Sequence, residues 1–187
     1  MLCHGNICRS PFAAALLSRQ LERTRTVVQV ESAGFLAPGR ASPPEAQAAA
    51  AQWDVDLTWH RSRHLSPLLI RSADLVVVME PAQRRVVRER YGPFADHILI
   101  LGDLDPLPIK TRPIPDPVGG PPAAYERSYA RIARCTAVLT AVLRRLPVGD
   151  NARTTRPTHF PSQANGSAAS DAASTTPGRQ SASLKSS

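Results

Sequence analysis

The chain has 187 residues, of which 42% are apolar and 5% aromatic, which is enough for one domain and an additional segment. No stretch approaches the ~18 consecutive apolar residues of a membrane span, and the first residues do not resemble a signal peptide. We therefore expect a cytoplasmic protein without a membrane span. The net charge is +8, but the basic residues form no runs interleaved with aromatic residues, so specific nucleic-acid binding is not expected.

Helices and strands are predicted to alternate along most of the chain. Ser10 is a suitable N-cap and Pro11 a suitable first residue of a helix, and β-branched residues predominate in the stretch 26–31. Two uninterrupted apolar runs, at 75–79 and 97–101, are typical of strands that are covered on both faces. The predicted elements, in chain order, are helix 11–23, strand 26–31, helix 44–53, strand 75–79, helix 81–91, strand 97–101 and helix 125–146.

This order predicts an α/β fold of three layers, in which a central parallel sheet carries helices on both faces. Such sheets bind ligands at the carboxyl ends of their strands. The pattern stops after Pro147, and residues 151–187 contain only Phe160 and Leu184 as large apolar side chains. We therefore predict a globular domain at 1–147 and a disordered tail, rich in Ser, Thr, Ala and Pro, at 148–187.

The first eleven residues carry the candidate chemistry. Cys3 lies six positions before Arg9, and Gly5 and Asn6 between them tolerate the left-handed backbone of a tight loop. The loop leads directly into a predicted helix, so its amides and the positive end of the helix can converge on a phosphate-like anion. The same surroundings favour the thiolate, the nucleophilic form of cysteine. The planar guanidinium of Arg9 can hold two phosphoryl oxygens, and Ser10 can donate its hydroxyl to Cys3.

Three cysteines are an odd number and do not suggest a disulfide framework. No Cys/His spacing is typical of a zinc site, and we expect neither a metal nor a cofactor. Cys135 falls in the predicted closing helix and is expected to be a core residue. A buried, inert thiol is the alternative for Cys3, but the turn residues and Arg9 would then be coincidental.

Several segments resemble the low-molecular-weight protein tyrosine phosphatases in order and spacing. Residues 3–11, Cys-His-Gly-Asn-Ile-Cys-Arg-Ser-Pro, resemble the signature loop of that family, and Ile114-Pro115-Asp116-Pro117 resembles its late Asp-Pro pair. Further similar segments are Glu31–Gly34, His60–Arg63, Ala73–Leu75 and Leu101–Pro106. The resemblance covers about residues 2–146 and implies a parallel sheet of four strands.

The resemblance implies a cysteine-dependent phosphatase that hydrolyses phosphotyrosine or related aryl phosphates. Cys3 would attack phosphorus and form a phosphocysteine, Arg9 would bind the phosphoryl group, and Asp116 would protonate the phenoxide and then activate water. The substrate-binding loop would comprise His4, Gly5, Asn6, Ile7, Cys8 and Ser10. Asn6 and Ser32 resemble a pair that holds this loop open by hydrogen bonds. The expected partners are phosphorylated proteins and phosphate-like anions, and we expect a monomer.

Alternatives remain open at several positions. Asp105 is also followed by proline and competes for the acid role, although the family pattern matches it to an earlier, non-catalytic Asp-Pro pair. Cys8 either packs in the loop or, by the resemblance, forms a reversible disulfide with Cys3 that protects the thiolate. Relatives that hydrolyse phosphoarginine resemble the loop but have Thr where this chain has Ile7, which favours the tyrosine-type activity. A non-catalytic phosphate-binding module is the alternative from another functional class.

The chain departs from the family in two places. Only two residues precede Cys3, whereas the family has a full central strand there, so we expect at most a stub of strand. Either the coding start lies upstream of Met1, which we favour because the later motifs are intact, or the protein is impaired. After the Asp-Pro pair the chain has Val118 and Gly119 in place of aromatic residues, which leaves Phe35 as the candidate aromatic wall of the pocket.

Overall fold

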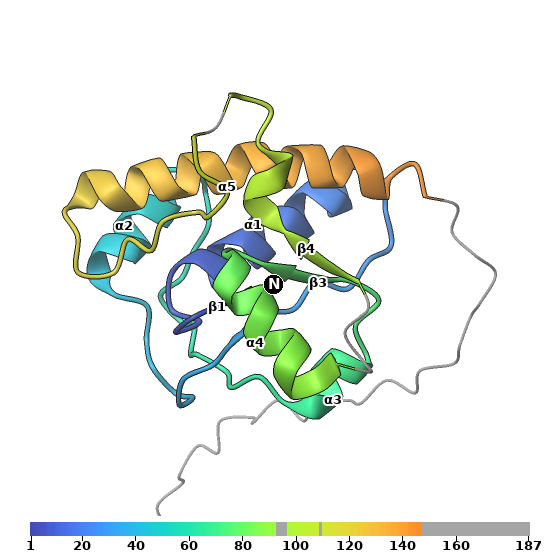
Figure 1. The fold of residues 1–187 in the computed structure, drawn as a ribbon. Coiled ribbons are helices and arrows are strands. Elements are labelled where there is room, and N and C mark those ends of the chain that lie inside the picture. The colour runs from blue at the N-terminus through green and yellow to red at the C-terminus, as the bar shows by residue number, and fades with distance from the viewer. Residues whose placement is uncertain (93–96, 109, 147–187) are drawn as a thin grey trace, which may run out of the picture. The chain divides into compact units, whose positions relative to one another are not determined.

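A computed structural model describes residues 1–92, 97–108 and 110–146, and the predicted tail at 148–187 lies outside them. Within these ranges, four parallel strands form one sheet in the order β2-β1-β3-β4 (Figure 1). The strands are β1 (Leu2–Cys3), β2 (Ala33–Gly34), β3 (Val76–Val78) and β4 (Ile98–Ile100). The helices are α1 (Arg9–Arg23), α2 (Pro44–Ala51), α3 (Pro67–Arg71), α4 (Pro81–Tyr91), the 3₁₀ helix η2 (Leu101–Leu104) and α5 (Pro122–Leu143). The predicted α/β fold is confirmed.

Helices cover both faces of the sheet because its strands are apolar on both sides. Successive strand residues point to opposite faces. Cys3 and Val77 belong to the core that α1, α2 and α5 close, whereas Leu2 and Val78 belong to a second core with residues of α3 and α4. In Figure 1 the long helix α5 accordingly lies with α1 on one side of the sheet and α4 lies on the other.

The prediction of a strand at 26–31 is wrong. These residues are not in a strand, and the side chain of Val27 is 90% exposed. The short strand β1 pairs with Ala33 and Gly34, which lie beyond the predicted stretch. A strand needs a neighbour for its backbone groups, and β1 provides one only for those two residues. The local β-branched composition is therefore overridden by the pairing register.

The central strand is the expected stub. Leu2 pairs on one side with Ala33 of β2 and on the other with Val78 of β3, whereas Cys3 pairs only with Gly34, so Leu2 joins the two halves of the sheet. The other predicted strands and helices are present with bounds that differ by a few residues at most. Besides β2, two further elements lie outside the predicted set, α3 and η2, because five and four residues are too few to show a period.

Ser10 does not cap the first helix, contrary to the sequence prediction. The helix α1 begins at Arg9, its N-cap is Cys8, and no side chain makes the capping hydrogen bond. The hydroxyl of Ser10 instead lies 3.0 Å from the Cys3 sulfur and accepts a hydrogen bond of 2.9 Å from the side-chain amide of Asn6. This hydroxyl therefore orders the loop before the helix rather than the helix terminus.

Helix α5 packs against the end of the loop that precedes α1. The rings of Phe12 in α1 and Tyr129 in α5 are stacked, with centroids 3.9 Å apart and planes 3° from parallel. The Tyr129 hydroxyl donates a hydrogen bond of 3.2 Å to the carbonyl oxygen of Cys8. Burial raises the pKa of this hydroxyl, so Tyr129 remains a donor. Cys135 of α5 is fully buried in the same core, as predicted.

Strand β2 touches the loop at Gly34. The residue after it, Phe35, donates its backbone N–H to the carbonyl oxygen of His4 at 2.9 Å. A Cβ atom on Gly34 would lie 2.8 Å from the backbone nitrogen of Asn6 and 2.9 Å from the carbonyl oxygen of His4. Contacts this short with backbone atoms cannot be relieved by a side-chain rotation, so the close approach requires glycine.

We expect Gly34→Ala to lower the free energy of unfolding by about 1–3 kcal/mol, because overpacking displaces backbone atoms of the loop. The measurement is urea unfolding followed by circular dichroism. Gly92→Ala is the matched control, because a Cβ at Gly92 meets no atom of the described residues within 4 Å. Equal stability of Gly34→Ala and wild type would contradict the close approach.

Candidate active site

The loop between β1 and α1 is held from behind by Asn6. This residue is fully buried and has a φ of +51°, the left-handed backbone that the sequence predicted there. Its side-chain amide donates to the hydroxyls of Ser10 at 2.9 Å and Ser32 at 3.0 Å, and its side-chain oxygen accepts from the backbone N–H of Arg63 at 2.8 Å. The carbonyl oxygen of Asn6 lies 2.7 Å from Nε2 of His60. The loop is thus tied to three other segments of the chain.

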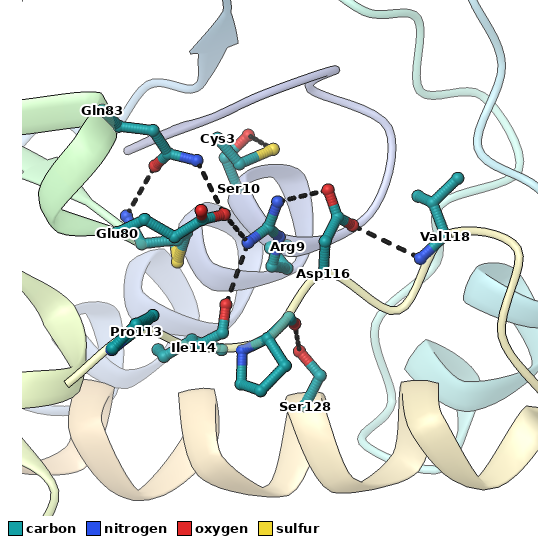
Figure 2. Close-up of polar contacts among 12 residues, drawn as sticks. Cys3, Arg9, Ser10, Glu80, Gln83, Pro113, Ile114, Asp116, Val118 and Ser128 are labelled. Atoms are coloured by element: carbon teal, nitrogen blue, oxygen red, sulfur yellow. Dashed lines mark hydrogen bonds and ion pairs between the residues drawn. The ribbon is translucent and has the colours of Figure 1, made fainter. Parts of the chain in front are cut away.

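Cys3 ends the central strand and lines the pocket that this loop surrounds. Cys3 is 3% exposed, and its sulfur lies 3.0 Å from the hydroxyl oxygen of Ser10 (Figure 2). A hydroxyl at this distance can donate a hydrogen bond to a thiolate. Cys3 also lies before the N-terminus of α1, where the helix dipole favours a negative charge.

The guanidinium of Arg9 is buried, with 1% of the side chain exposed. Its Nη1 donates to the Glu80 carboxylate and, at 2.9 Å, to the carbonyl oxygen of Ile114, and its Nη2 donates to the Asp116 carboxylate (Figure 2). Its Nε is also buried and has no hydrogen-bond partner in the described part of the chain. A buried donor without a partner is costly, so Nε is a site for an acceptor that a ligand would bring.

Glu80 is a site residue that the sequence analysis missed. It lies two residues beyond β3 and is the N-cap of α4. Gln83 fixes its position, because the Gln83 amide donates to the Glu80 carboxylate at 3.1 Å and accepts from the backbone N–H of Met79 at 2.9 Å (Figure 2). The available signal was the position, a carboxylate at the carboxyl end of a buried strand and directly before a helix.

Asp116 reaches the site on a proline-rich segment that is attached at both sides. The backbone N–H of Ile114 donates to the carbonyl oxygen of Met79 at 2.9 Å, and the Ser128 hydroxyl of α5 donates to the carbonyl oxygen of Pro115 at 3.3 Å. One Asp116 oxygen accepts from the backbone N–H of Val118 at 3.3 Å, and the other binds Arg9. The side chain is 40% exposed, so this carboxylate faces both the buried arginine and the solvent.

Asp105, the competing candidate for the acid role, lies elsewhere. Its side chain is 1% exposed and forms ion pairs with Arg131 at 3.1 Å and Arg134 at 2.9 Å, both on α5. The hydrogen bond from Arg134 holds the pKa of this carboxyl below its usual value. Asp105 is not among the residues that line the pocket. Its contacts are those of a group that attaches its loop to α5.

The pocket above Cys3 has a volume of about 100 Å³. Its lining residues are Cys3, His4, Gly5, Ile7, Cys8, Leu36, Arg40, Asp116 and Val118. Of the other predicted site residues, Asn6, Arg9 and Ser10 are buried behind this lining. Phe35, the expected aromatic wall, packs instead against the core of α3 and α4, because Leu36 is the residue directed to the pocket. The apolar part of the wall is therefore aliphatic, with Leu36 and Val118 both partly exposed.

Cys8 is a buried thiol in the lining of the pocket. Burial raises its pKa to about 12, so it is protonated at neutral pH. Cys3, Cys8 and Cys135 are all free. Both explanations of Cys8, loop packing and a reversible disulfide with Cys3, therefore remain open.

The described residues contain neither a cluster of metal-ligand side chains nor a membrane-spanning helix. Across 1–92, 97–108 and 110–146, no three His, Cys, Asp or Glu side chains are grouped as they would be to hold a metal ion. No helix within these ranges is long and apolar enough to cross a membrane.

Comparison with known proteins agrees with this geometry. The profile of a family described as low molecular weight phosphotyrosine protein phosphatase matches residues 1–147. The chain belongs to this family. A probable low molecular weight protein-tyrosine-phosphatase, EpsP of Ralstonia solanacearum, is 36% identical over 135 residues, which cover 72% of this chain and 87% of the relative. A protein-arginine-phosphatase of Bacillus subtilis is also 36% identical, over 101 residues that cover 54% of this chain and 67% of the relative.

Solved structures of other family members share the fold. A YwlE mutant from Bacillus subtilis superposes with a TM-score of 0.70 at 28% identity, covering 77% of this phosphatase chain and 96% of the other. Wzb of Vibrio vulnificus, solved in complex with benzylphosphonate, superposes with a TM-score of 0.67 at 26% identity, covering 75% and 94%. The expected family and fold are therefore confirmed, and both tyrosine- and arginine-directed phosphatases are among the relatives.

Proposed function

We propose that the protein hydrolyses phosphotyrosine and related aryl phosphates of proteins through a phosphocysteine on Cys3. The observation that carries this proposal is the buried, unpartnered Nε of Arg9 beside a pocket whose floor includes Cys3. A phosphoryl group in this pocket would supply the missing acceptor. The loop amides and the N-terminus of α1 would stabilise the remaining negative charge.

Binding of a phosphoryl dianion changes the partners of Arg9. The contacts of Nη1 with Glu80 and the Ile114 carbonyl hold one side of the guanidinium. On the other side, Nη2 binds Asp116, which is the partly exposed partner. A phosphoryl oxygen bound at this side of Arg9 competes with the Asp116 carboxylate for Nη2, because both groups are anionic acceptors. Displacement would leave the Asp116 carboxyl at the pocket wall, where a leaving group departs.

The reaction then follows in two steps. The Cys3 thiolate attacks phosphorus, the sulfur–phosphorus bond forms, and the bond from phosphorus to the phenolic oxygen breaks while protonated Asp116 gives that oxygen its proton. In the second step Asp116, now a carboxylate, takes a proton from water as that water attacks the phosphocysteine. Phosphate leaves and the Cys3 thiolate is restored, with Ser10 as its hydrogen-bond donor.

The lining of the pocket supports an aryl substrate. Leu36 and Val118 are apolar side chains at the wall, and an aromatic ring between them would be removed from water on both faces. Ile7 is a third apolar lining residue, at the position where the sequence resemblance places Thr in phosphoarginine-directed relatives. Hydrolysis of phosphoarginine is the second candidate activity, because a protein-arginine-phosphatase is among the relatives.

We expect turnover of a phosphotyrosine peptide in the presence of EDTA, with a higher kcat/KM than for the same peptide carrying phosphoarginine. Phosphate release measures both, and Cys3→Ser is the inactive control. A higher kcat/KM for phosphoarginine would transfer the proposal to the second candidate. Folded protein that binds phosphate without turnover of either peptide would support a non-catalytic phosphate-binding module.

The role of Asp116 predicts a dependence on the leaving group. Asp116→Asn should slow formation of the phosphocysteine by ~10²–10⁴-fold with phosphotyrosine, whose phenoxide is basic, and much less with an activated nitrophenyl ester. Rapid-quench kinetics of the first step give this rate separately from hydrolysis of the phosphocysteine.

Asp105→Asn is the matched control, because it changes another Asp-Pro carboxylate that does not line the pocket. Asp105→Asn should reduce the rate of phosphocysteine formation by the same factor with both substrates, if it reduces the rate at all. Equal losses with the two substrates in Asp116→Asn would remove Asp116 from the acid role, and a leaving-group dependence in Asp105→Asn would transfer the role to Asp105.

A further inference from the structure

An exposed arginine stands at the pocket wall in addition to the buried Arg9. Arg40 lines the pocket, and its Nη1 lies 3.2 Å from the point that a Cβ atom on Gly5 would occupy, so the guanidinium lies over the loop. Within the described residues no carboxylate forms an ion pair with Arg40. This positive charge is therefore open to a ligand that enters from solvent.

The backbone of Arg40 is hydrogen-bonded to Ser62 on both sides, although the Arg40 side chain is exposed. Its N–H donates to the Ser62 hydroxyl at 2.9 Å, and its carbonyl oxygen accepts from the Ser62 N–H at 2.8 Å. Ser62 is 4% exposed, and an antiparallel bridge joins the next residues, Ala41 and Arg61. These contacts with the 61–62 segment hold the backbone of Arg40 in position.

The neighbouring Arg61 is a second cation without a carboxylate partner in the described ranges. Its Nη1 donates only to carbonyl oxygens, of Thr58 at 3.2 Å and of His60 at 2.8 Å. The contact of His60 Nε2 with the carbonyl oxygen of Asn6 keeps this segment against the loop. Arg61 is not among the residues that line the pocket, so we call the exposed guanidinium of Arg40 at the pocket wall the basic rim.

The basic rim differs from the other arginines near the site in its lack of acidic partners. Arg63, two residues further along, forms an ion pair of 3.1 Å with Glu31. Arg9 is neutralised by Glu80 and Asp116. The phosphoryl group already has a buried cation and a helix N-terminus to bind, so the charge of the rim is available to another part of the substrate.

We propose that the basic rim binds a carboxylate side chain that flanks the phosphorylated residue of the substrate protein. The proposal rests on the proposed function, because a peptide whose phosphorylated side chain enters the pocket must carry its neighbouring residues across the rim. The occupant is therefore an acidic phosphopeptide. Exposed pairs of this kind contribute modestly and are screened by salt, so the rim selects among substrates rather than providing the main affinity.

The test compares two phosphotyrosine peptides of equal length, one with Glu and the other with Gln on both sides of the phosphorylated residue. We expect kcat/KM of the wild type to be about two- to fivefold higher for the Glu peptide at low salt, the range of exposed ion pairs, and this ratio to fall towards one at ~1 M salt. The ratio should fall towards one in Arg40→Ala and below one in Arg40→Glu. Taking the ratio within each variant cancels any change that affects both peptides alike.

Arg23→Glu is the matched control for net charge. Arg23 is exposed at the end of α1, about 21 Å along the helix from Arg9, and should leave the ratio at its wild-type value. A wild-type ratio of one, or a ratio that Arg40→Ala does not change, overturns the proposal. An equal loss with both peptides in Arg40→Ala would assign Arg40 to the phosphoryl group instead and also overturns it.

Binding of the same labelled peptides to the Cys3→Ser protein, measured by fluorescence anisotropy, gives a second readout that does not require turnover. The Glu peptide should bind more tightly, and the added change Arg40→Ala should abolish the difference. Absence of turnover in the wild type with a preserved binding preference would contradict the proposed function and leave the basic rim supported. Turnover without any preference in rate or binding would contradict only the basic rim.

Discussion

The burial of the Arg9 guanidinium is the constraint on which the rest of the site depends. A buried charge is costly unless it is paired and hydrogen-bonded, and removing one partner of such a pair typically costs about 3–5 kcal/mol. Glu80, the Ile114 carbonyl and Asp116 provide the compensation, and they come from two segments far from Arg9 in the chain. Assembly of the fold and assembly of the phosphate site are therefore the same event.

The sheet explains why these segments meet. Cys3 ends β1, and Glu80 follows β3, so both lie at the carboxyl edge of neighbouring parallel strands. The hydrogen bond from Ile114 to Met79 brings the proline-rich segment to the same edge, and with it Asp116. The two cations near the pocket then differ in kind: Arg9 is enclosed by anions, whereas Arg40 is exposed and free of them within the described residues.

Local residue preferences predict the contiguous part of the site, whereas Asp116 and Ser32 are predicted only from the family resemblance. The loop from Cys3 to Arg9 is encoded in neighbouring residues, and the left-handed Asn6 follows from local backbone preference. Tertiary contacts bring Glu80 to Arg9 and Arg40 to the pocket wall, and the only local signal for either is the position of Glu80 between a buried strand and a helix. The predictions of a strand at 26–31 and of a capping role for Ser10 are wrong because other contacts override local propensity. Pairing register decides the first, and hydrogen-bond contacts of Ser10 with Cys3 and Asn6 in the preceding loop decide the second.

The central claim is that the pocket transfers a phosphoryl group from an aryl ester to Cys3 before water removes it. The most direct measurement is mass spectrometry of peptides from enzyme that is mixed with an aryl phosphate and quenched in acid within the first turnover. The account predicts the added mass of one phosphoryl group on the peptide that contains Cys3 and on no other peptide. Phosphate release without any phosphorylated Cys3, or a phosphoryl group on a different residue, would contradict it.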